Sequence, residues 1–301
     1  MLRILDKNKV PVKGLKKYTD LCIESALELD DRTLSFSAPY RNIRNAIENE
    51  GYIETKDDRY VVKEIEKTSG GTAKIRAQLD LESLEGKAFR EFRSEEQTIR
   101  NALQLAFAGT GWTIGICEVS KKRTLSMSNA SALDVLKQAL KTYRCEITIN
   151  SKDQIIHIYT SVGEDKGCYF SNQLNLTKLT VQSTSYDFYT EIEPYGKDGL
   201  TIESVNDGKT YLENHQYSSK VKRCIWKDER YTVPESLKED AEAKLKDMSK
   251  PYVSYSANVI DLAKHSEKYS ILEYDIGDTV TLLDDLTDTR YQTVNGCYGL
   301  S

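Results

Sequence analysis

Residues 251–283 (PYVSYSANVIDLAKHSEKYSILEYDIGDTVTLL) limit the fold more than any other stretch of the chain. From Val253 to Val259 every second residue is apolar, which is the period of a strand with one buried face. Gly277 lies in a turn sequence, DIGD, where it is free to adopt a positive φ. This combination predicts the edge of a small antiparallel barrel or sandwich. Two further strands are predicted here, at 269–274 and 279–283.

Length, composition and charge indicate a protein of several domains that neither spans a membrane nor has a dedicated nucleic-acid surface. The 301 residues are enough for about two or three domains of ordinary size. Charged residues make up 30% and hydrophobic residues 39%, and no apolar run is long enough to span a membrane. The first residues lack the apolar segment of a secretory signal, so we expect folding in a cytoplasm. A net charge of -5 argues against a dedicated nucleic-acid surface, because phosphate binding needs clustered Lys and Arg.

The cysteines and histidines are scattered along the chain. No cysteine pair has the C-x-x-C spacing of a structural zinc site, so we expect reduced thiols that pack as small apolar side chains. His157 falls in an alternating pattern and is expected on a sheet face, and no histidine has a ligand partner close in sequence. The sequence therefore predicts no catalytic residue, no cofactor and no metal. The residues concerned are Cys22, Cys117, Cys145, Cys168, Cys224, Cys297, His157, His215 and His265.

Residues 1–84 are predicted to form a first β-barrel-like domain. Short apolar or alternating runs are separated by clusters of charged turn residues, which is the pattern of antiparallel hairpins. Pro39 ends one of these strands because proline cannot donate to a sheet. The predicted strands are 2–5, 22–29, 33–37, 51–55 and 59–65.

Residues 85–166 change character and are predicted to form an α+β domain. Ser94 and Gln97 fit a capping box, and the apolar residues that follow share one helical face up to Gly109, which is placed to end the helix. Trp112 is expected to anchor the next strand in the core. The other predicted elements are a helix at 130–143 capped by Ser128 or Asn129, and strands at 110–119, 146–149 and 154–159.

Residues 167–200 and 250–301 are predicted to form a second, discontinuous β-barrel-like domain, with a small α+β domain inserted at 201–249. The GEDKG loop at 163–167 carries two carboxylates, but a turn between strands explains it equally well. Pro234 opens an amphipathic helix, because proline is tolerated in the first turn. The predicted elements here are strands at 174–181, 186–194 and 200–205 and the helix at 236–248.

Several short motifs, taken together, resemble the N-terminal region of siphophage and prophage tail proteins of the tail-associated lysin, or prophage endopeptidase tail, family. The resemblance spans most of the chain. No single motif is diagnostic, but their order and spacing together are. The motifs are RYVVKEI at 59–65, GTGW at 109–112, GEDKG at 163–167 with NL at 175–176, YGKDGLTI at 195–202, PYVSY at 251–255 through DL at 261–262, and IGDTV at 276–280.

The resemblance implies a multi-domain α+β fold similar to phage baseplate hubs, with two small β-barrel-like domains and inserted α+β modules. In such a hub, three chains form a homotrimer whose six barrels make a pseudo-sixfold ring. That ring can meet a hexameric ring through near-equivalent surfaces. The implied function is a structural baseplate or tail-tip hub of a siphophage or prophage-derived tail. It would act as an adaptor at the virion tail tip, assembled in the bacterial host cytoplasm.

The resemblance also implies a set of partners. These are the distal tail protein ring, the tape measure protein and receptor-binding or lysin components of the tail tip. A central channel for DNA passage is implied without specific nucleic-acid binding, and no membrane partner is expected. Residues 290–301 depart from the family pattern, which continues with another basic and apolar strand.

Two other functions stay open from the sequence. A cell-wall-degrading tail endopeptidase, or its scaffold portion, would be recognised by turnover of peptidoglycan by this chain alone. We expect no enzymatic activity here, because no H-E-x-x-H or G-x-S-x-G motif is present and the lytic domain of the family lies C-terminal to the matched region. A carbohydrate-binding module is suggested by Tyr211, Tyr217 and Tyr231, although tyrosine is also common in half-buried sheets.

Overall fold

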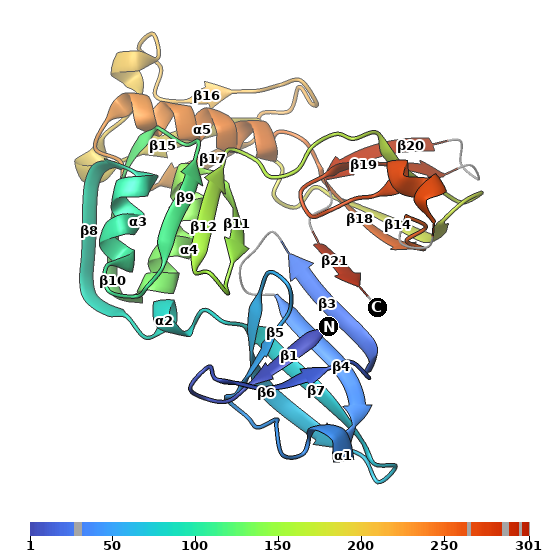
Figure 1. Ribbon diagram of the computed structural model, residues 1–301. Helices are drawn as coiled ribbons and strands as arrows, with labels where there is room; N and C mark the ends of the chain where they lie inside the picture. Colours follow the sequence, from blue (N-terminus) through green and yellow to red (C-terminus); the bar gives the residue numbers. More distant parts are fainter. Residues whose placement is uncertain (27–31, 264–265, 285–288, 295–296, 301) are drawn as a thin grey trace.

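The computed structural model describes residues 1–26, 32–263, 266–284, 289–294 and 297–300. Within these residues the strands form six sheets and the helices are few, which is the multi-domain α+β fold predicted from the sequence. Figure 1 shows an N-terminal sheet in blue, a green part built of helices and strands, a yellow to orange part beside it, and a separate part in which red strands lie with yellow-green ones.

A curled sheet, shaped like half a barrel, fills the N-terminal part (Figure 1). Its strands are β1 (Leu2–Leu5), β2 (Pro11–Leu15), β3 (Thr19–Ala26), β4 (Thr33–Pro39), β5 (Tyr52–Glu54), β6 (Arg59–Lys67), β7 (Thr72–Leu79) and β21 (Cys297–Leu300), in the order β2-β1-β5-β6-β7-β4-β3-β21. Alternate residues of β7 are buried, and Ile75 pairs with the buried Phe36 of β4. The short helix α1 (Tyr40–Ile43) follows β4. The predicted hairpins are confirmed within the described residues; positions 27–29 of the predicted strand 22–29 lie outside them.

The last strand of the chain corrects one prediction. The sequence places all of residues 250–301 in the second β-barrel-like domain, but β21 pairs antiparallel with β3 of the first sheet. The register runs from Cys297 opposite Ala26 to Leu300 opposite Ile23. Local periodicity indicates that a segment is a strand but not which sheet edge it joins. The first sheet is therefore built from both ends of the chain.

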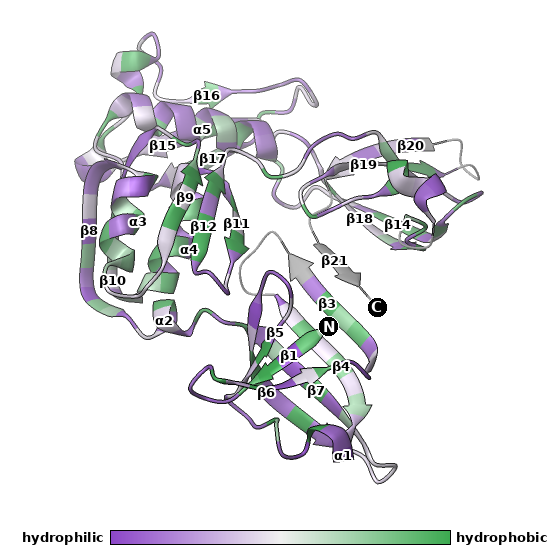
Figure 2. Cartoon of the chain, in the orientation of Figure 1, coloured by the Kyte–Doolittle hydropathy of each residue, from purple (hydrophilic) through white to green (hydrophobic). Residues whose placement is uncertain are grey.

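Residues 82–159 form the green α+β part of Figure 1. Its elements are α2 (Glu82–Glu85), β8 (Ala88–Thr98), α3 (Ile99–Phe107), β9 (Thr113–Cys117), β10 (Lys122–Ser131), α4 (Ala132–Tyr143), β11 (Glu146–Asn150) and β12 (Ile155–Tyr159). β8 pairs with β10, while β12 lies between β11 and β9. Figure 2 shows hydrophobic residues gathered along β11 and β12. Trp112 is buried as predicted, and it belongs to a buried apolar cluster that also includes residues of the first sheet.

Both helix caps in this part differ from the prediction. Ser94 lies inside β8, where its buried hydroxyl has no hydrogen-bond partner among the described residues, so the capping box at 94–97 is wrong. Thr98 caps α3 instead. Helix α4 is capped by Ser131, in a reciprocal box with Asp134, because strand pairing of β10 continues through the expected cap positions. Gly109 has a φ of +80° after α3, as predicted for its end.

The strands within residues 252–294, orange to red in Figure 1, form the second β unit, together with two strands from the middle of the chain. Its elements are β13 (Cys168–Ser171), β14 (Leu176–Thr184), β18 (Tyr252–Val259), η4 (Glu267–Leu272), β19 (Thr279–Asp284) and β20 (Thr289–Val294). β19 lies between β13 and β20, and β14 pairs with β18 as a two-stranded ribbon. Phe170, Leu176, Val280 and Leu282 form the buried core. The strand predicted at 269–274 is wrong: η4 is a 3-10 helix capped by Ser266.

An inserted α+β unit follows β14. It contains β15 (Glu191–Tyr195), η2 (Lys197–Gly199), η3 (Glu203–Val205), β16 (Leu212–Glu213), β17 (Arg223–Lys227) and α5 (Pro234–Met248). β15 is central, antiparallel to β16 and parallel to β17, so the prediction that it belongs to the second barrel (167–200) is wrong for this strand. The strand predicted at 200–205 contains the 3-10 turn η3 instead.

Helix α5 confirms the predicted start at Pro234 and the predicted apolar stripe. Ala241 and Leu245 pack against Ile192 of β15, while the Lys and Glu residues between them remain at the surface. No helix in the described part of the chain combines the length and apolar character needed to cross a membrane.

Candidate functional site

The GEDKG and IGDTV motifs, far apart in the sequence, meet in space. Gly163 and Gly277 have φ values of +84° and +87°, which favour glycine. A Cβ on Gly163 would lie 2.1 Å from the carbonyl carbon of Gly277, and a Cβ on Gly277 would lie 2.4 Å from the carbonyl oxygen of Val162. The two backbones are therefore too close for any side chain. This Gly163–Gly277 contact joins the loop after β12 to the turn before β19.

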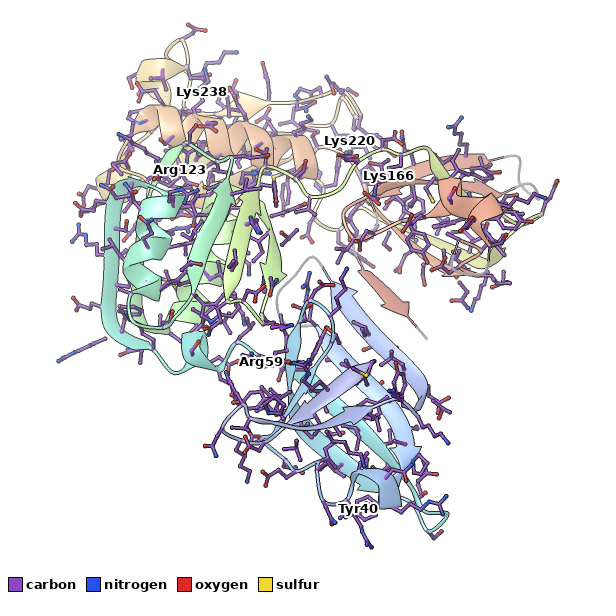
Figure 3. All side chains as sticks on the ribbon, viewed as in Figure 1. Tyr40, Arg59, Arg123, Lys166, Lys220 and Lys238 are labelled. Atoms are coloured by element: carbon purple, nitrogen blue, oxygen red, sulfur yellow. The ribbon has the colours of Figure 1, made fainter. Side chains whose placement is uncertain are left out.

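The carboxylate of Asp278 completes this contact. It is almost fully buried and accepts hydrogen bonds of 2.8 Å from the backbone N–H groups of Glu164 and Asp275 and from Lys166 Nζ (Lys166 is labelled in Figure 3). Burial alone would raise the pKa of Asp278, but the Lys166 ammonium and the two N–H donors outweigh it and lower the pKa. The GEDKG segment is thus a structural loop between β12 and β13, although it does not contain the predicted turn.

We expect Asp278 to make the free energy of unfolding depend on pH in the acidic range. Because its folded pKa lies below that of the unfolded chain, its contribution is complete above the ordinary aspartate value of about 4 and disappears as the pH falls through the folded value. Urea unfolding of the wild type and Asp278→Asn, followed over acidic pH, should show a stability difference that shrinks as the pH falls. Asp165→Asn, in the same loop but exposed, is the control. A difference that does not change with pH would contradict this role.

One face of the inserted sheet carries charged side chains around its central strand, β15. Glu191 of β15 is directly opposite Glu213 of β16 on one side and Arg223 of β17 on the other. Directly opposite residues share a face, so two carboxylates and a guanidinium are brought together. Arg223 Nη2 and Nε each lie 2.7 Å from Glu191 Oε2, and the guanidinium lies over the ring of Tyr211. Arg223 therefore compensates the repulsion between the two carboxylates.

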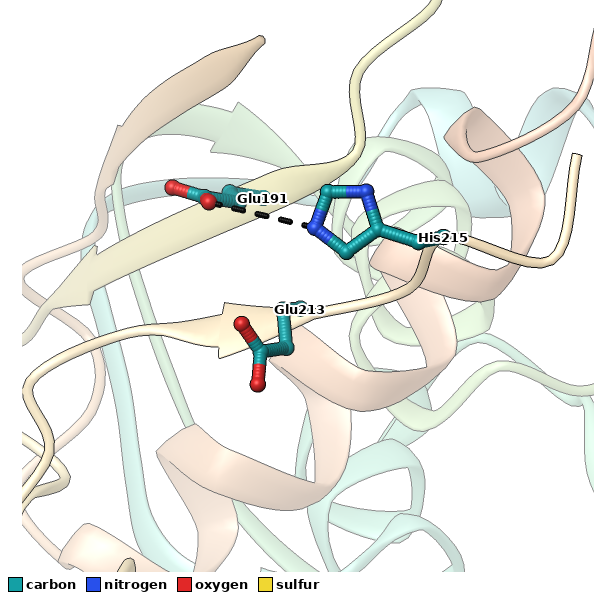
Figure 4. A group of neighbouring side chains, drawn as sticks. All are labelled: Glu191, Glu213 and His215. Carbon is teal, nitrogen blue, oxygen red and sulfur yellow. Dashed lines mark ion pairs between the residues drawn. The ribbon is translucent and has the colours of Figure 1, made fainter. Parts of the chain in front are cut away.

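His215 joins the same face from the residues just after β16 (Figure 4). Its Nε2 lies 4.0 Å from Glu191 Oε1, and its Nδ1 lies 3.1 Å from the carbonyl oxygen of Ser218. One ligand atom each of Glu191, Glu213 and His215 lies within 4.8 Å of the others, so these residues could hold a metal ion. The sequence did not predict this group, because Glu191 lies more than twenty residues before the other two. Glu213 and His215, spaced i and i+2, were the only local signal.

The cysteines and His157, which were singled out from the sequence, have structural roles in the described part of the chain. Five cysteines are free thiols; Cys297 has no described side chain. Burial raises the pKa of Cys145 to about 12 and that of Cys168 to about 11, so both remain protonated. His157 lies on β12, where its Nδ1 accepts the Ile116 N–H, as expected for a sheet residue. His265 lies outside the described residues.

The three tyrosines suggested for carbohydrate binding do not present three free rings. The ring of Tyr211 contacts Arg223, Tyr217 packs against Phe188, and Tyr231 is buried. This favours packing for Tyr211 and Tyr231, whereas Tyr217 is 63% exposed and its ring makes an edge contact with Phe188.

A buried ionic network joins the green α+β part to α5. Arg123 of β10 donates from Nε to Asp240 Oδ2 (3.0 Å) and from Nη2 to Glu239 (2.7 Å), and Tyr231 also donates to Asp240 (2.6 Å). Arg123 and Asp240 are each 4% exposed. Figure 3 shows Arg123 at the junction of the two parts. Arg59, also labelled there, makes a similar ion pair with Glu54 in the first sheet.

A cleft of about 800 Å³ opens beside this network, between α4, α5 and the ribbon of β14 and β18. Trp226 and Tyr252 line it, with five basic and five acidic side chains. Because the two signs balance, the cleft favours no ligand of a single charge.

The order of the parts matches three models of one protein family. The prophage endopeptidase tail N-terminal domain matches residues 2–78, a prophage endopeptidase tail domain matches residues 88–160, and the prophage endopeptidase tail model matches residues 164–294. The chain belongs to the prophage endopeptidase tail family. It is thus a phage tail protein, as the resemblance of its motifs predicted. Its curled sheet, α+β part and second β unit with its insert correspond to these three models in turn.

Solved structures of other tail proteins share this fold along nearly the whole chain. Prophage tail protein gp18 from Listeria monocytogenes EGD-e has a TM-score of 0.74 at 15% identity, covering 99% of this chain and 90% of that one. The 43 kDa tail protein of prophage MuSo2 from Shewanella oneidensis has a TM-score of 0.69 at 11% identity, covering 99% of this chain and 92% of that one. A tail protein from Neisseria meningitidis MC58 has a TM-score of 0.66 at 9% identity, covering 99% of this chain and 90% of that one. Identities this low establish the fold alone. No curated protein matches the chain.

Proposed function

We propose that this tail protein is a structural hub at the tip of a siphophage or prophage-derived tail. The observation that carries the proposal is a fold shared with phage tail proteins over 99% of the chain, with TM-scores of 0.66–0.74. The chain contributes two β units, the curled sheet and the second β unit. Three chains would supply six such units, so a homotrimer could bind a hexameric ring through near-equivalent surfaces.

The partners we propose are those that the family resemblance implies. The hub would join the hexameric distal tail protein ring and the tape measure protein on one side to receptor-binding or lysin components on the other, after assembly in the host cytoplasm. A channel along the threefold axis would let DNA pass. The net charge of -5 suits a conduit, because it does not favour tight binding to phosphates.

We infer no catalytic role for the chain. The raised pKa values of the buried Cys145 and Cys168 thiols make both poor nucleophiles. The carboxylates with lowered pKa values, such as Asp278 and Asp134, serve a backbone contact and a helix cap. These roles support a mechanical function. Peptidoglycan turnover by this chain would favour the alternative, a cell-wall-degrading endopeptidase.

The β14–β18 ribbon supports a contact between subunits. Its residues Leu179, Tyr255 and Val259 pack on the core of the second β unit. Val253 lies on the same face as Tyr255, two residues earlier, and Val181 is directly opposite Tyr255, yet each valine is 39% exposed. A two-stranded ribbon is marginally stable unless its apolar face is covered. We therefore place a subunit contact at Val181 and Val253.

Solution mass tests the trimer and this contact together. Light scattering at several concentrations should give about three times the 34.3 kDa of the chain. Val253→Glu should shift the mass toward that of a monomer, because a carboxylate would be buried without a partner. Ser256→Glu adds the same charge on the opposite face of β18 and should leave the trimer intact. A wild-type monomer at every concentration would contradict the homotrimer. Equal masses for the two variants would contradict the contact.

A further inference from the structure

We propose that Glu191, Glu213 and His215 bind a divalent transition-metal ion, for which Zn²⁺ suits the ligand set best. This site is independent of the proposed hub function. It lies on the polar face of the inserted sheet, with one ligand on the central strand, one on β16 and one just after β16 (Figure 4).

The three ligand atoms are near the spacing that one ion requires. Zinc ligands lie about 2.0–2.2 Å from the metal, so in a tetrahedral site two ligand atoms are separated by roughly 3.3–3.6 Å. The 4.0 Å between His215 Nε2 and Glu191 Oε1 is a few tenths of an ångström longer than this, and His215 is exposed, so its side chain has room to move closer. The carboxylate of Glu213 lies within 4.8 Å of both, and its side chain is half exposed. In the bound state we expect the exposed side chains of Glu213 and His215 to shift until all three ligand atoms surround the ion.

Hydrogen bonding prepares the histidine as a ligand. The carbonyl oxygen of Ser218 can only accept, so the 3.1 Å contact with His215 Nδ1 assigns the proton of the neutral imidazole to Nδ1. The lone pair is then on Nε2, which faces Glu191. Metal-binding histidines characteristically donate their other ring N–H to a carbonyl or carboxylate. In this arrangement a lone pair faces a carboxylate oxygen, and a cation between them would remove the repulsion.

The carboxylates are also prepared. Glu191 is 5% exposed, and Arg223 occupies its Oε2, which fixes the side chain and leaves Oε1 facing His215. Lys209 lies 3.5 Å from Glu213 Oε1, but its ammonium is exposed and can turn away to solvent when a cation binds. Solvent reaches the group from the side of Glu213 and His215, which gives the ion an entry path.

The chemistry of the ligands selects the ion. An imidazole nitrogen with two carboxylates suits zinc and neighbouring transition metals, whereas Mg²⁺ and Ca²⁺ prefer oxygen ligands throughout. The ion would have a structural effect, because β16 is short: its register with β15 has two residue pairs, and one more hydrogen bond runs from the Asn214 N–H to the Thr190 carbonyl oxygen. A metal bridge would attach the segment after β16 to the central strand more firmly than these contacts do.

A protonated His215 paired with Glu191 is the competing explanation of the same geometry. The two explanations have opposite pH dependence. Metal binding weakens as the pH falls because the ligands must lose their protons. An ion pair would strengthen as the imidazole gains its charge.

The test uses the untagged full chain, treated with a chelator and then titrated calorimetrically with Zn²⁺ near neutral pH. We expect one Zn²⁺ per chain and a higher melting temperature in its presence. Co²⁺ should give visible absorption bands typical of a site with a nitrogen ligand. His215→Ala and Glu213→Gln should each weaken Zn²⁺ binding at least about ten-fold. Both side chains are exposed, so neither change should prevent folding.

His157→Gln is the matched control, because it also removes a histidine but keeps an acceptor for the Ile116 N–H. It should bind Zn²⁺ like the wild type. The proposal is overturned if the wild type binds no Zn²⁺, or if His215→Ala binds it as tightly as the wild type. Binding that grows stronger at lower pH would also overturn it.

Discussion

Gly163→Ala should destabilise the second β unit by about 4 kcal/mol. A positive φ costs a non-glycine residue about 1–2 kcal/mol, and forcing a methyl group against packed atoms costs about 1–3 kcal/mol more. Here the new Cβ would lie 2.1 Å from the Gly277 carbonyl carbon and 2.4 Å from the Asp278 nitrogen. These are backbone atoms, so no side-chain rotation can relieve the overlap. The loop and the turn would have to separate, and the hydrogen bonds to Asp278 would break with them.

Gly167→Ala separates the two causes. Gly167 lies in the same loop with a φ of +74°, but a Cβ at this position would meet no atom of the described residues within 4 Å. It should therefore lose only the conformational part, about 1–2 kcal/mol. Urea unfolding gives the two stabilities, and hydrogen exchange measured by mass spectrometry should show faster exchange in β13 and β19 for Gly163→Ala only. Equal losses in both variants would show that the close backbone approach is unimportant.

For the contact between Gly163 and Gly277, the sequence could predict the conformation of Gly277 but not the contact itself. The DIGD turn indicates that Gly277 adopts a positive φ, and the structure confirms it. The GEDKG sequence is typical of a turn, whereas in the structure residues 163–167 form an irregular loop between β12 and β13. Nothing in local spacing could show that the two pack backbone to backbone, since Glu164 and Asp278 are 114 residues apart. Such a pairing depends on the tertiary arrangement of β13 and β19, which are parallel and discontinuous in sequence.

The same limit explains the metal-binding group and the last strand. Glu191, Glu213 and Arg223 meet only through the registers of β15 with β16 and β17, and β16 has just two paired residues. Sequence periodicity identifies β15 as extended but assigns it to the wrong sheet. Helices with strong amphipathic patterns, such as α5, are predicted well because their signal is local.

Replacing Arg123 should have the other large effect. Arg123 and Asp240 are each 4% exposed, and they connect β10 to α5 through Nε and Oδ2 at 3.0 Å. Arg123→Met keeps much of the apolar stem but leaves Asp240 buried without its cation. Removing one partner of a buried pair costs about 3–5 kcal/mol, mainly because the remaining charge is not compensated. An exposed pair, Arg76 with Glu64, provides the control: Arg76→Met should cost less than about 1 kcal/mol.

A second substitution tests the reason for this loss. Asp240→Asn removes the uncompensated charge and keeps an oxygen to accept the Tyr231 hydroxyl hydrogen bond, which is 2.6 Å long. In the Arg123→Met background it should therefore restore about 2 kcal/mol, whereas in the wild type it should destabilise. Urea unfolding followed by tryptophan fluorescence suits this cycle, because Trp226 packs against Tyr231. If Asp240→Asn gives no recovery, lost packing and not the buried charge explains the cost, and the connection between β10 and α5 is held mainly by apolar contacts.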